Sequence, residues 1–237
     1  MIIDNENLVI LIEVMKTGTT FIRRNVKSLG IPNDIFISSN ISERHLPLSH
    51  IFNHSALKYD PKKYDIFMFT RHPEDFFVSE FFEYKNNNII PYLNNALFKN
   101  PHTDAMKNYM KKLHSRYKFF KEEDAFDLNK NLHSLLSDDN FQHFPKRLVN
   151  IKSIFKHYLD VEIEESKLHI CKYENFKDSI DKFFKAIKKP IPNINKRVNV
   201  SQKNQKINRE NRALINEIFD YDFKKYGYFK RSIYSTI

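Results

Sequence analysis

Short apolar runs alternate with segments of helical periodicity along much of the chain. The first run, Leu8–Val14, is rich in β-branched residues and bounded by polar ones, which is typical of a buried parallel strand. Thr19–Leu29 follows with apolar residues at helical spacing, and Gly30 and Pro32 end it. Further strands are predicted at Asp34–Ser38, Tyr64–Thr70 and Leu168–Tyr173.

Helices are predicted after the later strands as well. Pro73 suits the first turn of a helix that continues through the apolar positions up to Phe82. Two more segments, Phe176–Ile187 and Arg209–Tyr221, have helical spacing. Strands that alternate with helices indicate an α/β layer fold with a parallel sheet flanked by helices.

The stretch from Lys85 to Lys146 breaks this alternation. It is rich in Asn, Lys and His, and its apolar residues are scattered at helical spacing. We interpret it as a helical insertion (85–146) beside the sheet within a single domain that spans 1–237. Two roles stay open for it, because such a segment can cover an acceptor site or serve packing alone.

Composition narrows the class of protein. The chain has 237 residues, enough for one substantial core, and a single cysteine, Cys171, which excludes an internal disulfide and a multi-cysteine metal site. No apolar run approaches the roughly 18 residues that span a bilayer, so no stable membrane insertion is expected. Since no signal peptide is apparent either, we expect a cytoplasmic protein.

The net charge of +10 allows two interpretations. One is an anionic ligand, such as a nucleotide, an acidic acceptor or nucleic acid. The other is a lysine-rich composition without a specific anionic partner. Charge alone does not identify a ligand, so the choice depends on local motifs.

The loop Met15–Thr20 directly follows the first strand and opens a helix. Unpaired backbone N–H groups at a helix N-terminus, together with the helix dipole, bind an anion. Gly18 lets the backbone approach the ligand, Lys16 can place its ammonium group on it, and the hydroxyls of Thr19 and Thr20 can donate to it. Thr17 completes the predicted loop. The alternative is an ordinary strand-to-helix turn.

A second motif ends the strand at 64–70 and enters the next helix. Arg71 stands at the carboxyl end of that strand, where ligands of open α/β sheets bind. A guanidinium group suits paired hydrogen bonds to a phosphate, and the Ser79 hydroxyl, farther along the helix, can complete the contact. A surface arginine and an unrelated helix serine would also explain the pattern.

Together these segments resemble the sulfotransferases that use 3′-phosphoadenosine 5′-phosphosulfate (PAPS), nearer the carbohydrate branch than the cytosolic phenol branch. The loop Met15–Thr20 is similar to the family's phosphosulfate loop, and Arg71–Ser79 resembles R-x-P-x-[DE]-x-x-x-S, whose Arg and Ser hold the donor's 3′-phosphate. The resemblance covers the first third of the chain closely. It implies a P-loop-like three-layer fold with a central parallel sheet, and transfer of a sulfuryl group from PAPS to a hydroxyl or amine, with 3′-phosphoadenosine 5′-phosphate as product.

Two later segments match the family less specifically. Tyr173–Phe176 resembles the segment Y-E-[DN]-[LF], in which the tyrosine borders the adenine, and Lys196–Ser201, with Arg197, resembles a basic loop that closes over the nucleotide. A helix start and a solvated basic turn explain these two segments nearly as well. The cytosolic branch's R-K-G-x-x-G-D-W segment is absent.

The resemblance also implies roles in catalysis. Lys16 would stabilise the bridging oxygen as it leaves, and a general base would take the acceptor's proton. Some carbohydrate sulfotransferases have a base histidine at the start of an H-x-x-x-[ST] segment, so His45 is our first choice, with Glu43 and His50 in reserve. No metal is expected for this chemistry. The acceptor is not identified by the sequence, and a saccharide is one candidate.

Two other functions remain as alternatives. A P-loop-like nucleotide kinase or hydrolase would share the strand–loop–helix arrangement, although G-x-x-x-x-G-K-[ST] is missing, as is the dinucleotide-binding G-x-G-x-x-G. A nucleic-acid-binding module would use the excess of lysine and arginine together with aromatic residues. We do not expect nucleic acid as the partner, because no RNA- or DNA-binding motif is visible and most aromatic residues stand in apolar runs.

Overall fold

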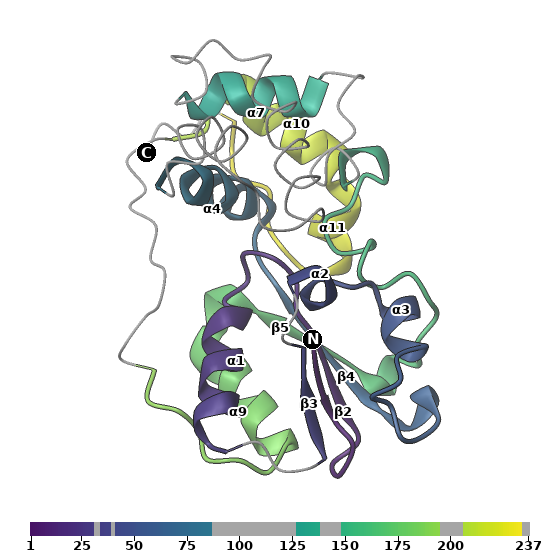
Figure 1. The fold of residues 1–237 in the computed structure, drawn as a ribbon. Coiled ribbons are helices and arrows are strands. Elements are labelled where there is room, and N and C mark those ends of the chain that lie inside the picture. Colours follow the sequence, from purple (N-terminus) through teal and green to yellow (C-terminus); the bar gives the residue numbers. More distant parts are fainter. Residues whose placement is uncertain (31–33, 39–40, 87–126, 138–147, 195–205, 234–237) are drawn as a thin grey trace, which may run out of the picture. The chain divides into compact units, whose positions relative to one another are not determined.

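The computed structural model describes residues 1–30, 34–38, 41–86, 127–137, 148–194 and 206–233 (Figure 1). The chain divides into two compact units: Met1–His72 with Phe155–Val200, and Pro73–Ile154 with Ser201–Ile237. The expectation of one domain, 1–237, with an insertion at 85–146 stays a prediction. Most of that insertion lies outside the described residues.

A five-stranded mixed sheet forms the centre of the first unit, with strand order β3-β1-β2-β4-β5. Its strands are β1 (Ile2–Asp4), β2 (Val9–Ile12), β3 (Ile35–Ile37), β4 (Asp65–Thr70) and β5 (Leu168–Lys172). β2, β4 and β5 run parallel, with Ile10 opposite Ile66 and Phe67 opposite His169. Four of these strands lie inside the ranges expected from the apolar runs, so the α/β class is confirmed.

The expected parallel sheet is found for β2, β4 and β5, but the whole sheet is mixed, because β1 runs antiparallel to both β2 and β3. β1 and β2 form a hairpin whose turn is held by the Asp4 carboxylate, which accepts hydrogen bonds from the backbone N–H groups of Glu6 and Asn7. A three-residue strand is too short for a periodic pattern, and the sequence analysis did not predict it. Its insertion separates β2 from β3 in the sheet.

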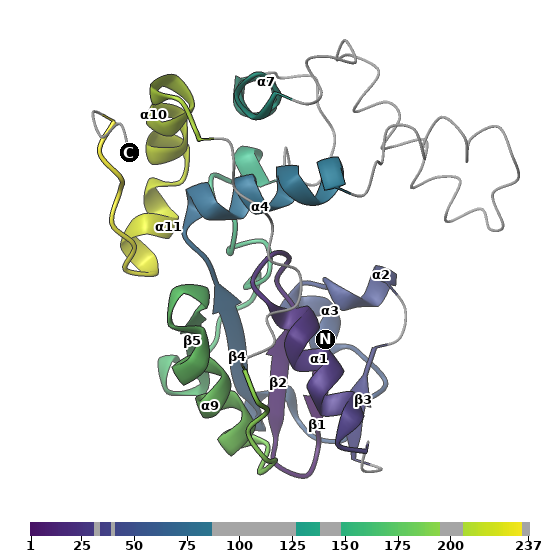
Figure 2. The same ribbon diagram turned by 90° about the vertical axis from the view of Figure 1, so that its left-hand side faces the viewer.

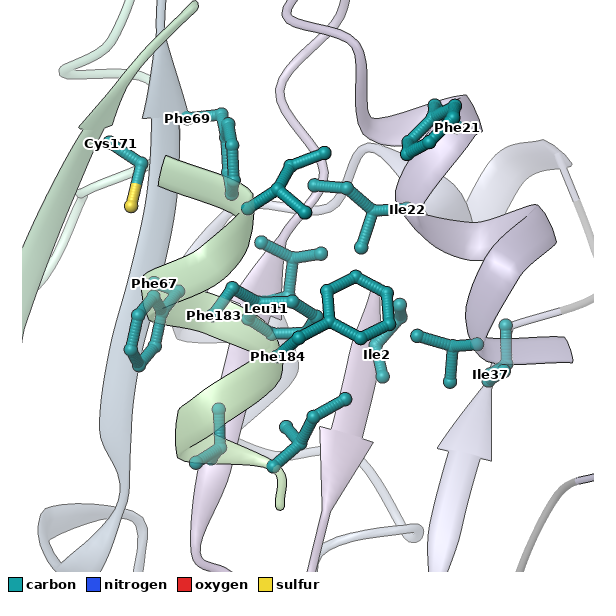
Figure 3. Close-up of a cluster of buried hydrophobic side chains, with 14 of the residues drawn as sticks. Ile2, Leu11, Phe21, Ile22, Ile37, Phe67, Phe69, Cys171, Phe183 and Phe184 are labelled. Atoms are coloured by element: carbon teal, nitrogen blue, oxygen red, sulfur yellow. The ribbon is translucent and has the colours of Figure 1, made fainter. Parts of the chain in front are cut away.

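Helices cover the faces of this sheet. α1 (Thr19–Ser28) and α9 (Phe176–Ala186) lie side by side on one face, and α3 (Leu48–Phe52) lies on the other (Figures 1 and 2). Figure 3 shows the core under α1 and α9, where Ile22 and Phe183 meet Leu11 of β2. Shorter elements complete this unit: α2 (Ile41–Arg44) and the 3₁₀ turns η1 (Pro61–Lys63), η3 (Glu165–Lys167) and η4 (Tyr173–Asn175).

The described part of the second unit is helical. It contains α4 (Pro73–Asn86), α7 (Leu128–Ser137), α10 (Arg209–Ile218) and α11 (Asp220–Lys225). Pro73 begins α4, as expected. The single helix predicted at Arg209–Tyr221 is instead two, since the backbone at Phe219 leaves helical geometry between α10 and α11. The Phe219 ring is buried and packs on Phe77 of α4, with ring centroids 5.2 Å apart.

Candidate functional site

The loop between β2 and α1 has two residues in the left-handed backbone region. Lys16 has φ 60° and Gly18 has φ 83°. Gly18 is the N-cap of α1 and makes no side-chain capping bond, and the first turn of the helix contains no acidic residue. A ten-residue helix that begins in this way offers its first N–H groups and the positive end of its dipole to an anion.

Gly18 is required for space as well as for conformation. A Cβ atom at this position would lie 2.6 Å from Cε2 of Phe176 and 3.1 Å from Cε2 of Tyr173. The residues after β5 therefore pack directly against the loop after β2. No larger residue fits there without displacing an aromatic ring.

The threonines of the loop contribute differently from one another. Thr17 donates its hydroxyl to the Val14 carbonyl at 2.8 Å, and Thr19 donates to the same oxygen at 3.3 Å. Both are buried, so their hydroxyl protons stabilise the loop itself. Thr20 is exposed. Of the two threonines expected to donate to a ligand, Thr20 therefore has the better access.

Arg71 connects three of the strand ends. It follows β4 directly, is only 6% exposed, and donates from Nη1 to the Lys16 carbonyl at 2.9 Å. Its guanidinium carbon lies 4.5 Å from the centre of the Tyr173 ring, a cation–π contact. The residues that follow Arg71 and Tyr173 are also in contact, since the His72 N–H donates to the Glu174 carboxylate at 2.8 Å. The predicted residues Lys16, Arg71 and Tyr173 are thus brought together.

His45 lies just after α2, against the end of β2. Its Nδ1 is 2.6 Å from the Glu13 backbone oxygen. Since a carbonyl oxygen only accepts, Nδ1 carries the proton and Nε2 keeps its lone pair. Burial lowers the pKa of His45 below its ordinary value of 6.5, against the opposing effects of this hydrogen bond and of the Glu13 carboxylate. The imidazole is therefore a neutral base close to the chain that leads into the loop.

The two reserve residues have other contacts. The Glu43 carboxylate accepts a hydrogen bond from the Ser38 hydroxyl at 3.2 Å. His50 is exposed on α3, with Nδ1 3.2 Å from the Ser49 hydroxyl. His45 is thus the only one of these three residues for which a contact with the β2 strand end is described.

Two predicted residues do not join this group in the described structure. Ser79 is a half-buried residue of α4 in the second unit, whereas Arg71 belongs to the first, so their shared role at one phosphate stays a prediction. Arg197 lies outside the described residues.

Two charged residues beside the loop were not predicted from the sequence. Glu13 directly follows β2, Arg23 lies on the buried side of α1, and their side chains are only 3% and 5% exposed. A usable signal was present: a carboxylate stands inside the apolar run Leu8–Val14, and an arginine ten positions later stands on the apolar face of the next helix. Buried charges of opposite sign at that spacing indicate an ion pair.

The fold is that of a mixed α/β protein in which the loop after β2 leads directly into α1. Comparisons with known protein families, with curated proteins and with solved structures found no match. Within the described residues, no helix is both long enough and apolar enough to cross a membrane. The same residues contain no cluster of three or more histidine, cysteine, aspartate or glutamate side chains arranged for a metal ion.

Proposed function

We propose that this protein transfers a sulfuryl group from PAPS to a hydroxyl or amine of an acceptor, with a saccharide as one candidate. The observation that supports this most is a convergence: Arg71 bonds to the backbone of Lys16, and His45 bonds to the backbone of Glu13, three residues before Lys16. These residues were selected from three separate motifs. Their contacts with one short stretch of chain favour a shared site over three unrelated coincidences.

Positive groups at the loop after β2 can offset the negative charge of the donor. The N-terminus of α1 offers N–H groups without a neighbouring acidic residue, and Lys16 and Arg71 supply two cations at the same loop. When bound, PAPS supplies a sulfuryl group whose bond to the phosphate oxygen breaks as the acceptor oxygen or nitrogen forms a bond to sulfur. Lys16 then stabilises the negative charge on the departing phosphate oxygen.

His45 has the properties of the general base in this proposal. Nδ1–H is held by the Glu13 carbonyl, so Nε2 is the nitrogen that accepts the acceptor's proton. Because burial lowers the pKa of His45 below 6.5, a larger fraction of the imidazole is neutral and able to accept a proton near pH 7 than in an exposed histidine. No protein group is alkylated or oxidised in the step, and the proton ends on His45.

A P-loop-like kinase or hydrolase is the second candidate. It is favoured by the strand–loop–helix connection from β2 to α1. It differs in the ligand that it requires, since such an enzyme binds ATP with Mg²⁺. The nucleic-acid-binding alternative is weakened by the aromatic residues, because many phenylalanines are buried in the cores of the two units. Phe67, Phe69, Phe183 and Phe184 are examples.

The decisive experiment compares ligands by thermal shift and calorimetric titration on the whole chain. We expect 3′-phosphoadenosine 5′-phosphate to bind more tightly than AMP and without a metal. A ligand at 100 times its Kd stabilises the native state by about 2.7 kcal/mol, a rise in Tm of roughly 5–10 °C for a chain of this size. Equal affinity for the two nucleotides, or a preference for ATP with Mg²⁺, would contradict the proposal.

A further inference from the structure

A buried ion pair lies between the end of β2 and the middle of α1. Arg23 Nη2 is 2.5 Å from Glu13 Oε1, and Arg23 Nε is 3.2 Å from Glu13 Oε2, so the guanidinium plane meets both carboxylate oxygens. Both side chains are almost fully removed from water. Burying two charges is expensive, and an apolar pair of similar size would often stabilise a fold as well or better. The pair therefore suggests a purpose besides stability.

The pair reaches the two strand ends that β1 separates. Arg23 Nη1 donates to the Ser38 carbonyl, just beyond β3, while the same guanidinium group holds Glu13, just beyond β2. The Ser38 hydroxyl in turn donates to Glu43 at 3.2 Å. The Glu13 carbonyl accepts the proton of His45 Nδ1. Both ends of the short segment Glu43–His45 are thus hydrogen-bonded to residues that Arg23 also holds, although through other atoms of those residues.

We propose that Arg23 is a positioning residue that fixes His45 as the Nδ1–H tautomer by holding the Glu13 carboxylate and the Ser38 carbonyl with one guanidinium group. A guanidinium group suits this task because its rigid fork serves two acceptors on different strands, whereas an ammonium group is a point donor. The catalytic meaning of this role rests on the proposed function. The tautomer itself does not, because it follows from the hydrogen bond.

The charges around His45 give the pair a second effect. The groups that face the imidazole electrostatically are the Glu13 carboxylate, the Arg23 guanidinium and the Met1 amino group, which lies 3.2 Å from Glu13 Oε1. A lone carboxylate here would favour the imidazolium form. The positive charge of Arg23 offsets the charge of this carboxylate, so Nε2 of His45 stays unprotonated and able to accept a proton.

Nitrogen-15 NMR of the whole chain tests the proposal without any substrate, with His45→Asn used only to assign the resonance. We expect His45 of the parent to exist as a single Nδ1–H tautomer. Arg23→Gln should produce a mixture of tautomers and raise the titration midpoint of His45. The matched control is Arg24→Gln, which removes a neighbouring exposed arginine of α1 and should change neither observable.

Two results would overturn the inference: an Nε2–H tautomer in the parent, or an Arg23→Gln protein that folds and keeps the parent's tautomer and midpoint. If Arg23→Gln does not fold, Arg23→Lys replaces it, since it keeps the charge and loses the fork. Arg23→Lys should also show mixed tautomers, and an unchanged single tautomer counts against the proposal.

Kinetics separate this inference from the proposed function. If both hold, Arg23→Gln lowers sulfuryl transfer by about 10–100-fold, as a misplaced catalytic group does, with an unchanged Kd for 3′-phosphoadenosine 5′-phosphate. If the nucleotide does not bind the parent at all, the proposed function fails while the NMR result still decides the role of Arg23. Loss of nucleotide affinity in Arg23→Gln, with the tautomer intact, would assign Arg23 to the nucleotide instead.

Discussion

Lys16 combines a strained backbone with a proposed chemical role, and two substitutions separate them. A non-glycine residue in the left-handed region carries a penalty of about 1–2 kcal/mol. The free energy of unfolding measured by urea titration should therefore be about 1 kcal/mol higher for Lys16→Gly than for Lys16→Ala. Both should lose sulfuryl transfer by about 10²–10³-fold, because both lack the ammonium group. Turnover within a few-fold of the parent in either variant would remove Lys16 from the chemistry.

Gly18 and Gly30 form a matched pair for testing the packing of the loop. Both have positive φ, 83° and 74°, but only at Gly18 would a Cβ meet other atoms, at 2.6 Å from Phe176. Gly30→Ala should cost about 1 kcal/mol of stability, for backbone strain alone. Gly18→Ala should cost more and should also weaken nucleotide binding. Equal losses in the two urea titrations would show that the ring moves aside freely.

The titration of His45 should be visible in the stability of the fold. The pKa of His45 is lower in the folded chain than the ordinary 6.5. As the pH falls through this region, His45 therefore binds more protons in the unfolded chain than in the folded one. The free energy of unfolding should therefore fall as the pH drops through this range. His45→Asn should remove that part of the slope between pH 7.5 and 5.5. His169, whose pKa burial also lowers, contributes equally to both proteins. Identical slopes would contradict the assignment.

At the residue scale, Lys16, Arg71 and His45 were predicted because each stands in a segment that resembles a sulfotransferase motif and follows an expected strand, and strand ends of a sheet converge. It did not predict the partners that hold them. Glu13 and Arg23 fall inside patterns of apolar residues, and their pairing depends on the rotation of α1 against β2. The expectation that the Tyr173 ring borders adenine stays a prediction, and the structure adds that this ring lies beside the Arg71 guanidinium group and against Gly18.

At the scale of elements, the apolar runs located four strands because each run is long enough to show its burial. β1 was not predicted, because a three-residue strand is too short to show a period. Its antiparallel pairing with β2 was therefore not predicted either. The turn residues Asp4–Asn7 offered the missing signal, because closely spaced Asp and Asn residues favour a tight turn. The hairpin matters for the candidate site, since it places β1 between β2 and β3.

The acidic positions at the start of α4 have a structural role that the motif alone did not suggest. Arg231 holds the Asp75 carboxylate with two hydrogen bonds, at 3.1 and 2.8 Å. Glu74, whose side chain is 2% exposed, has Arg212 at 3.1 Å and Arg231 at 3.3 Å. These contacts tie the first turn of α4 to α10 and to the segment after α11, within the second unit.

Substitution of these two acids should rank by burial. Glu74→Gln removes the buried carboxylate charge that faces Arg212 and Arg231 and should cost about 3 kcal/mol. Asp75→Asn weakens a half-exposed pair and should cost about 1 kcal/mol or less. Urea unfolding followed by circular dichroism measures both. A larger loss for Asp75→Asn than for Glu74→Gln would show that the motif acid, and not the buried one, stabilises the start of α4.

At the scale of the whole molecule, the strand–helix alternation was readable and the division into two units was not. The first unit takes its strands from segments before His72 and after Phe155, and the segment between them belongs to the second unit. The apolar residues of that middle segment have helical spacing but are scattered, so their pattern predicted helices beside the sheet and not a second compact unit. Because Arg71 and Ser79 belong to different units, each must be mutated separately to test the 3′-phosphate prediction.

The net charge of +10 also leads to a prediction for the whole molecule. Salt weakens the binding of nucleic acid to exposed charges more than the binding of a nucleotide at a buried arginine. Arg71 is 6% exposed, so a nucleotide phosphate bound to it is poorly screened. The Kd for 3′-phosphoadenosine 5′-phosphate should therefore rise only a few-fold between roughly 50 and 200 mM NaCl. Generic RNA held by six to ten surface contacts would lose about 10³–10⁵-fold in affinity over the same range.

Calorimetric titrations of both ligands at the two salt concentrations make this comparison. Lys224→Gln is a suitable control, because Lys224 has a 78% exposed side chain in the second unit and pairs with Asp220. It should leave the nucleotide Kd unchanged, whereas Lys16→Gln should raise it. If RNA binds tightly at 200 mM NaCl and displaces the nucleotide, the charge serves nucleic acid, and the sulfotransferase proposal loses its ligand.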